Sequence, residues 1–177
     1  QASSQYGAPP HHRARFSLLS PRYENDEAVG LRFGWEDESA RLNLNILTKI
    51  EEQNPGAGRD WLMKLPGMTE DVADAILDWI DADDEPRDNG AESETYATMD
   101  PPYGPKNGPL ESVEELLLVR GVTPALLFGS DANRNGMFDR GGLSMTALSE
   151  GDAGGLSMQS GWARYLTIFS MESNLRP

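Results

Sequence analysis

A dense run of carboxylates constrains this chain more than any other feature. It extends from Asp78 to Glu94, and between Glu70 and Asp100 the chain carries twelve acidic residues and a single basic one, Arg87. Carboxylates at such density repel one another unless a cation lies among them. The region must therefore either remain solvated or be organised by a positive charge, and the sequence has to indicate which.

The whole chain is acidic as well. Its 177 residues contain 29 acidic and 15 basic side chains, for a net charge of −14. This balance argues against nucleic acid as a partner, because phosphate binding needs clustered lysines and arginines. It favours cations and basic or neutral protein surfaces. The chain has no cysteine, which excludes disulfides and thiolate metal sites.

The two ends of the chain carry signals typical of strands. The segments 30–35 and 41–45 alternate apolar and polar residues, and 36–40 is expected to turn the chain between them. A third run, 163–170, also resembles a strand. Gln1 to Arg15 has no apolar period and is expected to be a tail. No window of ~18 apolar residues predicts a membrane helix, and no signal peptide is visible after Gln1.

The middle of the chain is predicted to be helical. Short helices are expected at 46–52 and 60–65, followed by a longer one that begins after an N-cap at Thr69. Along this longer helix one set of residues forms an apolar stripe at helical spacing, and a set of acids lies on the other side. The stripe comprises Val72, Ile76, Trp79 and Ile80, and the acids are Asp74, Asp78 and Asp81. Like charges on one face weaken a helix by a few tenths of a kcal/mol per pair, roughly, so compensation is expected.

A long segment rich in proline and glycine, 84–108, follows without a clear secondary-structure pattern. Loops of this length inside a domain are usually functional or held by a ligand. Helical signals return with a Ser112–Glu115 capping box, and Gly121 is expected to end that helix. Thr123 is then expected to cap another helix, with Pro124 at its first position. Strands around a helical middle indicate an α+β domain with a helical insertion.

The acidic loop is the first candidate metal site. Calcium takes six to eight oxygen ligands from carboxylates, carbonyls and water, and a glycine-containing acidic loop supplies them. The expected ligands, which flank the turn at Gly90, are Asp81, Asp83, Asp84 and Glu92. A solvated acidic loop without an ion is the alternative.

A second candidate calcium loop lies further along the chain. Acidic and amide side chains alternate and are followed by Gly136, as in the first half of an EF-hand loop. Its expected oxygen donors are Asp131, Asn133, Asn135, the Met137 carbonyl and Asp139. The acid that should close such a loop is replaced by Gly142, so closure would have to come from Glu150 or Asp152. The alternative is an Asn-Gly turn without an ion.

Two further functions remain open from the residues alone. The segments 65–69 and 119–123 resemble the hairpin of helix-hairpin-helix modules, whose DNA-binding versions contact phosphate. The acids Glu70 and Asp71 at the following helix N-terminus argue against that function. A hydrolase based on paired carboxylates is the other possibility. No nucleophile motif supports it, and both histidines lie in the predicted tail.

An ordered set of motifs resembles the type II secretion minor pseudopilin K family (general secretion pathway protein K). The motifs are Asp78-Trp79-Ile80-Asp81, Gly90-Ala91-Glu92, Pro102-Tyr103-Gly104-Pro105-Lys106-Asn107, Ser112-Val113-Glu114-Glu115-Leu116 and Val119-Arg120-Gly121-Val122, with Leu42-Asn43-Leu44-Asn45 before them. The resemblance covers roughly residues 36–129, and 161–174 resembles the return to a pilin-type sheet. The 131–139 loop is not part of it.

The resemblance implies an α+β fold: a small pilin-like sheet with a large inserted α-helical domain, SAM-like and containing helix-hairpin-helix elements. It divides the chain into an N-terminal tail (1–28), pilin-like strands (29–45), the helical domain (46–129), a loop and linker (130–160) and a return strand (161–177). It implies Ca²⁺ near the acidic loop and no enzymatic activity. It also implies a place at the pseudopilus tip, where the protein helps initiate assembly and protein export with minor pseudopilins of the I and J types. Finally, it implies anchoring at the periplasmic face of the inner membrane through an N-terminal helix absent from this chain, so that this chain is expected to be the soluble portion.

Overall fold

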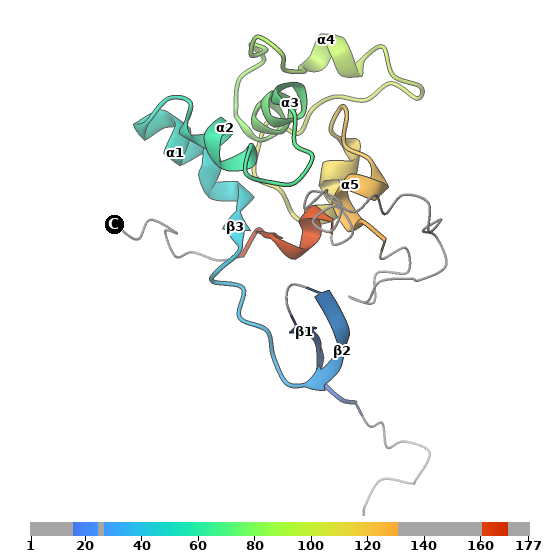
Figure 1. Cartoon of the computed structure of the whole chain (residues 1–177). Helices are drawn as coiled ribbons and strands as arrows, with labels where there is room; N and C mark the ends of the chain where they lie inside the picture. Colours follow the sequence, from blue (N-terminus) through green and yellow to red (C-terminus); the bar gives the residue numbers. More distant parts are fainter. Residues whose placement is uncertain (1–15, 25–26, 131–160, 170–177) are drawn as a thin grey trace, which may run out of the picture. The chain divides into compact units, whose positions relative to one another are not determined.

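The computed structural model describes residues 16–24, 27–130 and 161–169. Its described residues fall into two compact units, one up to Glu36 and the other from Asp37 onward. Figure 1 draws the elements of both and labels α1 to α5 and β1 to β3. Helices and small sheets occur together, so the predicted α+β class is confirmed at that level.

The first unit is an antiparallel hairpin of β1 (Leu19–Glu24) and β2 (Glu27–Phe33). Leu19 pairs with Phe33, and the Gly34 amide donates to the Leu18 carbonyl at 3.1 Å. The strand predicted at 30–35 is thus present as β2, but its partner is β1 and not the segment 41–45. β1 lies inside the range 1–28 that was assigned to the tail. Pro21 interrupts its pattern, and a hairpin tolerates proline because each of its strands is an edge.

The second sheet joins distant parts of the chain. β3 (Leu42–Asn43) and β4 (Leu166–Thr167) pair in parallel, and the Leu42 amide donates to the Tyr165 carbonyl at 2.8 Å. Both lie within predicted strands but are shorter. β3 stops because the Asn43 side chain accepts the Asn45 amide at 2.9 Å and caps the 3-10 turn η2 (Leu44–Ile46). A local side-chain hydrogen bond therefore replaces the expected ladder.

Short helices and turns make up most of the second unit, together with one longer helix. They are α1 (Leu47–Gln53), α2 (Ala57–Leu62), α3 (Glu70–Ile80), α4 (Ser93–Tyr96), η3 (Val113–Leu118), α5 (Pro124–Phe128) and η4 (Trp162–Arg164). α4 forms within the segment 84–108, where no secondary structure was expected. Among the helices of the described ranges, none combines the length and hydrophobicity that crossing a bilayer requires.

The three predicted helix N-caps agree with the structure to different degrees. Thr123 caps α5 as expected, since its side chain accepts the Leu126 amide at 3.3 Å and Pro124 takes the first position. Thr69 precedes α3 but makes no side-chain cap bond. The Ser112–Glu115 capping box forms only in part. η3 is a 3-10 helix, and Ser112 makes no side-chain cap bond. The Glu115 carboxylate accepts the Glu111 amide at 2.7 Å and also bonds the Ser112 main chain.

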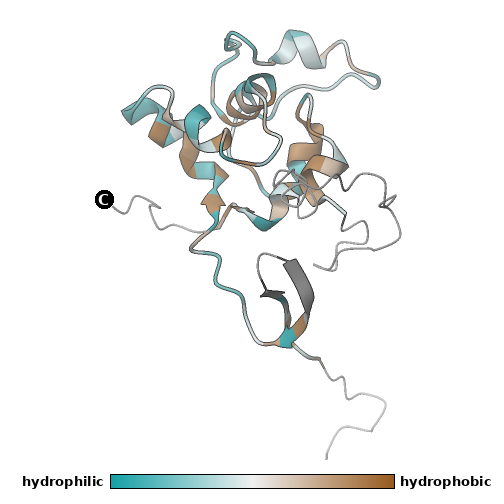
Figure 2. Cartoon of the chain, in the orientation of Figure 1, coloured by the Kyte–Doolittle hydropathy of each residue, from teal (hydrophilic) through white to brown (hydrophobic). Residues whose placement is uncertain are grey.

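The core gathers around α3. Figure 2 shows hydrophobic colouring on parts of α1 to α3 and on α5, while the segment after α3 is mostly hydrophilic. Figure 1 shows α1 and α2 beside α3, and the orange-red η4–β4 segment close to α5. The Trp162 indole N–H donates to the Pro66 carbonyl at 2.8 Å, which ties the C-terminal segment to the turn before α3. Gly121 has φ +85°, and a Cβ there would lie 2.8 Å from Val72 Cγ2, so the turn after η3 packs closely on α3.

Candidate functional site

Two acids of α3, Asp74 and Asp78, are enclosed by the protein. Residues 72–80 are all buried, and Asp74 and Asp78 are 0% exposed. The apolar stripe predicted from the sequence is therefore present, but the opposite side of the helix is covered as well. A buried carboxylate is tolerated only when paired and hydrogen-bonded, so each of these aspartates needs partners within the fold.

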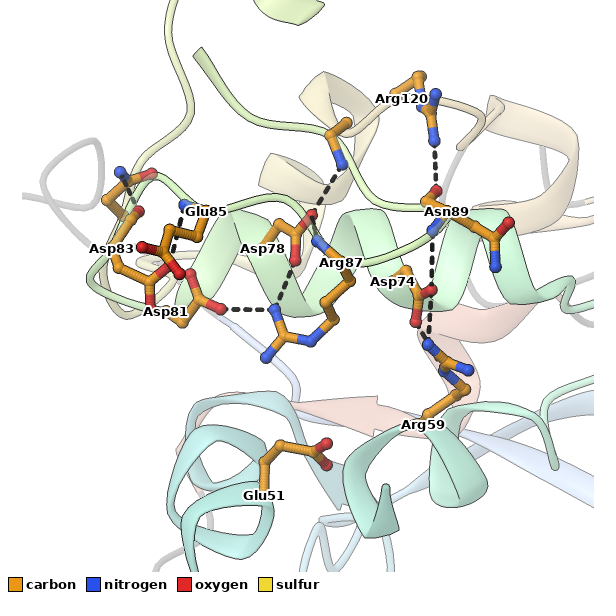
Figure 3. Close-up of polar contacts among 12 residues, drawn as sticks. Glu51, Arg59, Asp74, Asp78, Asp81, Asp83, Glu85, Arg87, Asn89 and Arg120 are labelled. Carbon is orange, nitrogen blue, oxygen red and sulfur yellow. Dashed lines mark hydrogen bonds and ion pairs between the residues drawn. The ribbon is translucent and has the colours of Figure 1, made fainter. Parts of the chain in front are cut away.

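Asp74 is held by a bidentate ion pair. Arg59 of α2 donates from Nε to one carboxylate oxygen and from Nη2 to the other, both at 2.7 Å (Figure 3). The Asn89 amide adds a third bond at 3.3 Å, and Arg120 Nη2 donates to the Asn89 carbonyl at 2.5 Å. This pairing links α2, α3, the acidic loop and the turn after η3. Sequence reasoning missed Arg59, whose partner lies fifteen positions away on another helix.

Asp78 anchors the acidic loop to α3. Its Oδ2 accepts the amides of Arg87 at 3.2 Å and Ala91 at 2.8 Å, and its Oδ1 accepts Arg87 Nη1 at 2.5 Å. A Cβ on Gly90 would lie 1.8 Å from Asp78 Oδ2, so only glycine fits between these two amides. The loop 87–91 is thus folded around the carboxylate of Asp78, whose charge is offset by hydrogen-bond donors of the loop.

Arg87 supplies part of the positive charge that this region needs. Besides Asp78, its Nη1 donates to Asp81 Oδ2 at 2.5 Å, so one guanidinium bridges two acids at the end of α3 (Figure 3). Burial raises the pKa of Asp81, while Arg87 acts in the opposite direction. Among the residues that the structure describes, the remaining acids of the loop have no ion pair of this kind.

Three of the predicted ligands converge beyond Arg87. Asp81, Asp83 and Glu92 each offer an oxygen, and these oxygens lie within 4.8 Å of one another. Glu92 is only 3% exposed, and neither of its carboxylate oxygens has a hydrogen-bond partner among the described residues. Oδ1 of Asp81 is also buried without one. Burial, and then the charges of Asp78 and Asp81, raise the pKa of Glu92 to about 8.

The remaining predicted ligands are not members of this group, although the charge of Asp84 contributes to the raised pKa of Glu92. Asp84 is outside this three-carboxylate group, and its Oδ1 accepts the Ser93 amide at 3.2 Å. Hydrogen bonds from Ser93 lower its pKa. The whole second candidate loop, with Asp131, Asn133, Asn135, Met137 and Asp139, lies outside the described residues.

The three-carboxylate group fits a hard divalent cation. Its donors are all oxygens, with no imidazole or thiolate among them, which is the set that Ca²⁺ and Mg²⁺ prefer. Buried carboxylate oxygens without donors carry a large desolvation cost unless a proton or a cation offsets it. A bound cation would use the oxygens of Asp81 and Glu92 that have no donor.

Comparison with known proteins adds independent information. A family model described as "Type II secretion system (T2SS), protein K" matches residues 40–128. A type II secretion system protein K of Pseudomonas aeruginosa is 32% identical over 105 residues, which cover 55% of this chain and 32% of that protein. The protein K of Klebsiella pneumoniae is 46% identical over 52 residues, 29% of this chain and 16% of its own length.

The residues that the family model matches include the acidic loop and the helices around it. The Pectobacterium carotovorum protein K is 42% identical over 53 residues, 30% of this chain and 16% of its own length. The matched part thus spans a third or less of each of these relatives. The family model covers half of the present sequence. This chain therefore belongs to the type II secretion system protein K family.

Proposed function

We propose that this chain is part of a non-enzymatic minor pseudopilin, a type II secretion component whose helical unit is structured by Ca²⁺. Family membership supports the secretion role. The observation that carries the calcium role is the buried, donor-free Glu92 carboxylate beside Asp81 and Asp83. Asp84 would lie next to this group, and the 131–139 loop would supply a second site of its own.

The cation would complete the charge balance of the acidic loop. Arg87 offsets the charges of Asp78 and Asp81 on one side. On the other side, Glu92 faces Asp81 and Asp83 without a positive partner among the described residues. A calcium ion bound there would remove the repulsion and hold the start and end of the loop 81–92 together. Its chemistry would be structural: no step of a reaction passes through it.

The finer parts of the fold and location are proposed on the family alone. The small sheet would be pilin-like and the helical unit SAM-like, with helix-hairpin-helix turns at 65–69 and 119–123. The protein would sit at the pseudopilus tip with minor pseudopilins of the I and J types and help initiate assembly and protein export. It would be held at the periplasmic face of the inner membrane by an N-terminal helix outside this sequence.

Two experiments test the two halves of the proposal. Calorimetric titration of the chain with CaCl₂ should give saturable binding, and the melting temperature should rise in calcium relative to chelator. An unchanged melting temperature and no heat of binding would remove calcium from the proposal. For the assembly half, co-purification with recombinant I-type and J-type pseudopilins is expected, and failure to associate with either would contradict it.

A further inference from the structure

Arg87 occupies a special position in the acidic loop. It is the single basic residue between Glu70 and Asp100. Its side chain is 24% exposed, and its guanidinium bridges the fully buried Asp78 and the partly buried Asp81. Its main-chain amide also donates to Asp78. Backbone and side chain of one residue thus fasten the loop to the end of α3.

The two carboxylate oxygens of Asp81 differ in their hydrogen bonding. Oδ2 accepts the bond from Arg87, while Oδ1 is buried without a partner. Figure 3 shows Asp81 between Arg87 on one side and Asp83 on the other. When one oxygen of a carboxylate is held by a hydrogen bond, the direction of the other oxygen is fixed as well. Outer-shell partners generally orient metal ligands in this way.

We propose that Arg87 is a positioning residue for the cation site: it orients Asp81 toward Asp83 and Glu92 and keeps the loop folded on α3 before the cation arrives. The inference rests on the proposed binding of Ca²⁺ by these three carboxylates. It assigns the acidic loop two cations with separate tasks, a built-in guanidinium that holds the scaffold and a divalent ion that closes the loop.

Arg87 has two opposing effects on calcium affinity, orientation of a ligand and repulsion of the ion, and their difference in sign makes the inference testable. A positive charge near a cation site repels the ion and lowers its affinity. If repulsion were the main effect, removing the guanidinium would strengthen calcium binding. If orientation is the main effect, removal weakens binding. Orientation is expected to dominate because Arg87 also balances Asp78, which is 0% exposed and whose other donors among the described residues are the loop amides of Arg87 and Ala91.

The chain offers a matched control in Arg59. This arginine also pairs with a fully buried aspartate of α3, Asp74, through two bonds at 2.7 Å. Its side chain is 34% exposed, comparable with that of Arg87, and Asp74 is not among the three clustered carboxylates. Loss of Arg59 therefore removes a similar ion pair from the same helix without touching a proposed ligand.

The experiment measures the Kd for calcium by calorimetry for the whole 177-residue chain and for Arg87→Gln, Arg87→Lys and Arg59→Gln. Hydrogen exchange of the 81–92 amides in chelator is followed in parallel. Arg87→Gln should weaken calcium binding by roughly 10-fold or more, the usual effect of losing an outer-shell partner. Arg87→Lys keeps the charge but replaces the guanidinium, whose Nη1 bonds both acids, by an ammonium group on a shorter side chain, and should fall between Arg87→Gln and the unchanged chain. Faster exchange in Arg87→Gln is expected as well.

Each outcome bears on the inference. Arg59→Gln should lower the melting temperature while its Kd stays within about two-fold of the unchanged chain, as expected for a site outside the outer shell. Equal or tighter calcium binding by both Arg87 variants would overturn the positioning role, and so would an equal loss in Arg59→Gln. If Arg87→Gln does not fold, Arg87→Lys decides by the same criterion. If the unchanged chain binds no calcium, the proposed calcium function and this inference both fail, which the other outcomes do not imply.

Discussion

Replacing Asp78 with asparagine is the sharpest test of how the acidic loop is held. The side chain is 0% exposed and accepts three hydrogen bonds, from Arg87 Nη1, the Arg87 amide and the Ala91 amide. Asparagine has the same shape but only one acceptor oxygen. In either amide orientation its NH₂ group faces a donor, so at least one bond becomes a repulsive contact.

The expected loss of unfolding free energy is about 3 kcal/mol. A hydrogen bond to a charged group contributes roughly 1.5–3 kcal/mol, and breaking one side of a buried ion pair costs about 3–5 kcal/mol. The lower end applies because Arg87 keeps its second partner, Asp81, and is itself partly exposed. A loss of this size should lower the melting temperature by roughly 10 °C.

Urea unfolding followed by far-ultraviolet circular dichroism, in chelator, measures this loss. Asp71→Asn is the matched control, since Asp71 lies on the same helix but is exposed. It should change the unfolding free energy by about 0.5 kcal/mol or less. A loss below about 1 kcal/mol for Asp78→Asn would refute the argument that this carboxylate anchors the loop.

Three further changes have expected outcomes. Because burial raises the pKa of Glu92 from its usual 4.5 to about 8, the folded state binds the extra proton in that window. The melting temperature in chelator should therefore fall as pH rises from 4.5 to 8. Glu92→Gln should flatten this fall and remove the increase in melting temperature that calcium causes. An unchanged dependence of the melting temperature on pH in this variant would contradict the prediction. Gly90→Ala places a Cβ 1.8 Å from Asp78 Oδ2 and should cost about 2–4 kcal/mol in urea unfolding, whereas Gly104→Ala, with open space around it, should be near neutral. Trp162→Phe loses the indole bond to a main-chain carbonyl and should cost about 1–3 kcal/mol; a neutral result would show that this bond does not stabilise the C-terminal segment.

Some local features of the fold were predictable from the sequence. The cap at Thr123 and the proline after it act through the main chain of neighbouring residues. The apolar stripe of α3 is likewise a property of spacing alone. Strand pairing was not predictable in the same way. β2 pairs with β1 and β3 with β4, and nothing in the period of a strand names its partner.

The acidic loop shows the same division. The sequence by itself determined that this region must either remain solvated or be organised by positive charge, because it carries twelve acids and one arginine between Glu70 and Asp100. It also indicated Asp81, Asp83, Asp84 and Glu92 as candidate ligands of this loop, and three of them, all but Asp84, converge in the structure. It placed Asp74 and Asp78 on a polar side of the helix, without showing that this side is buried.

Only the tertiary structure decided how each charge is balanced. It buries Asp74 against Arg59 of α2 and folds the loop so that Arg87 reaches Asp78 and Asp81. It leaves the Glu92 oxygens without a donor among the described residues. The physical reason is that burial and pairing of a carboxylate depend on segments distant in the chain, whereas its charge and helical position are fixed by residues close in sequence.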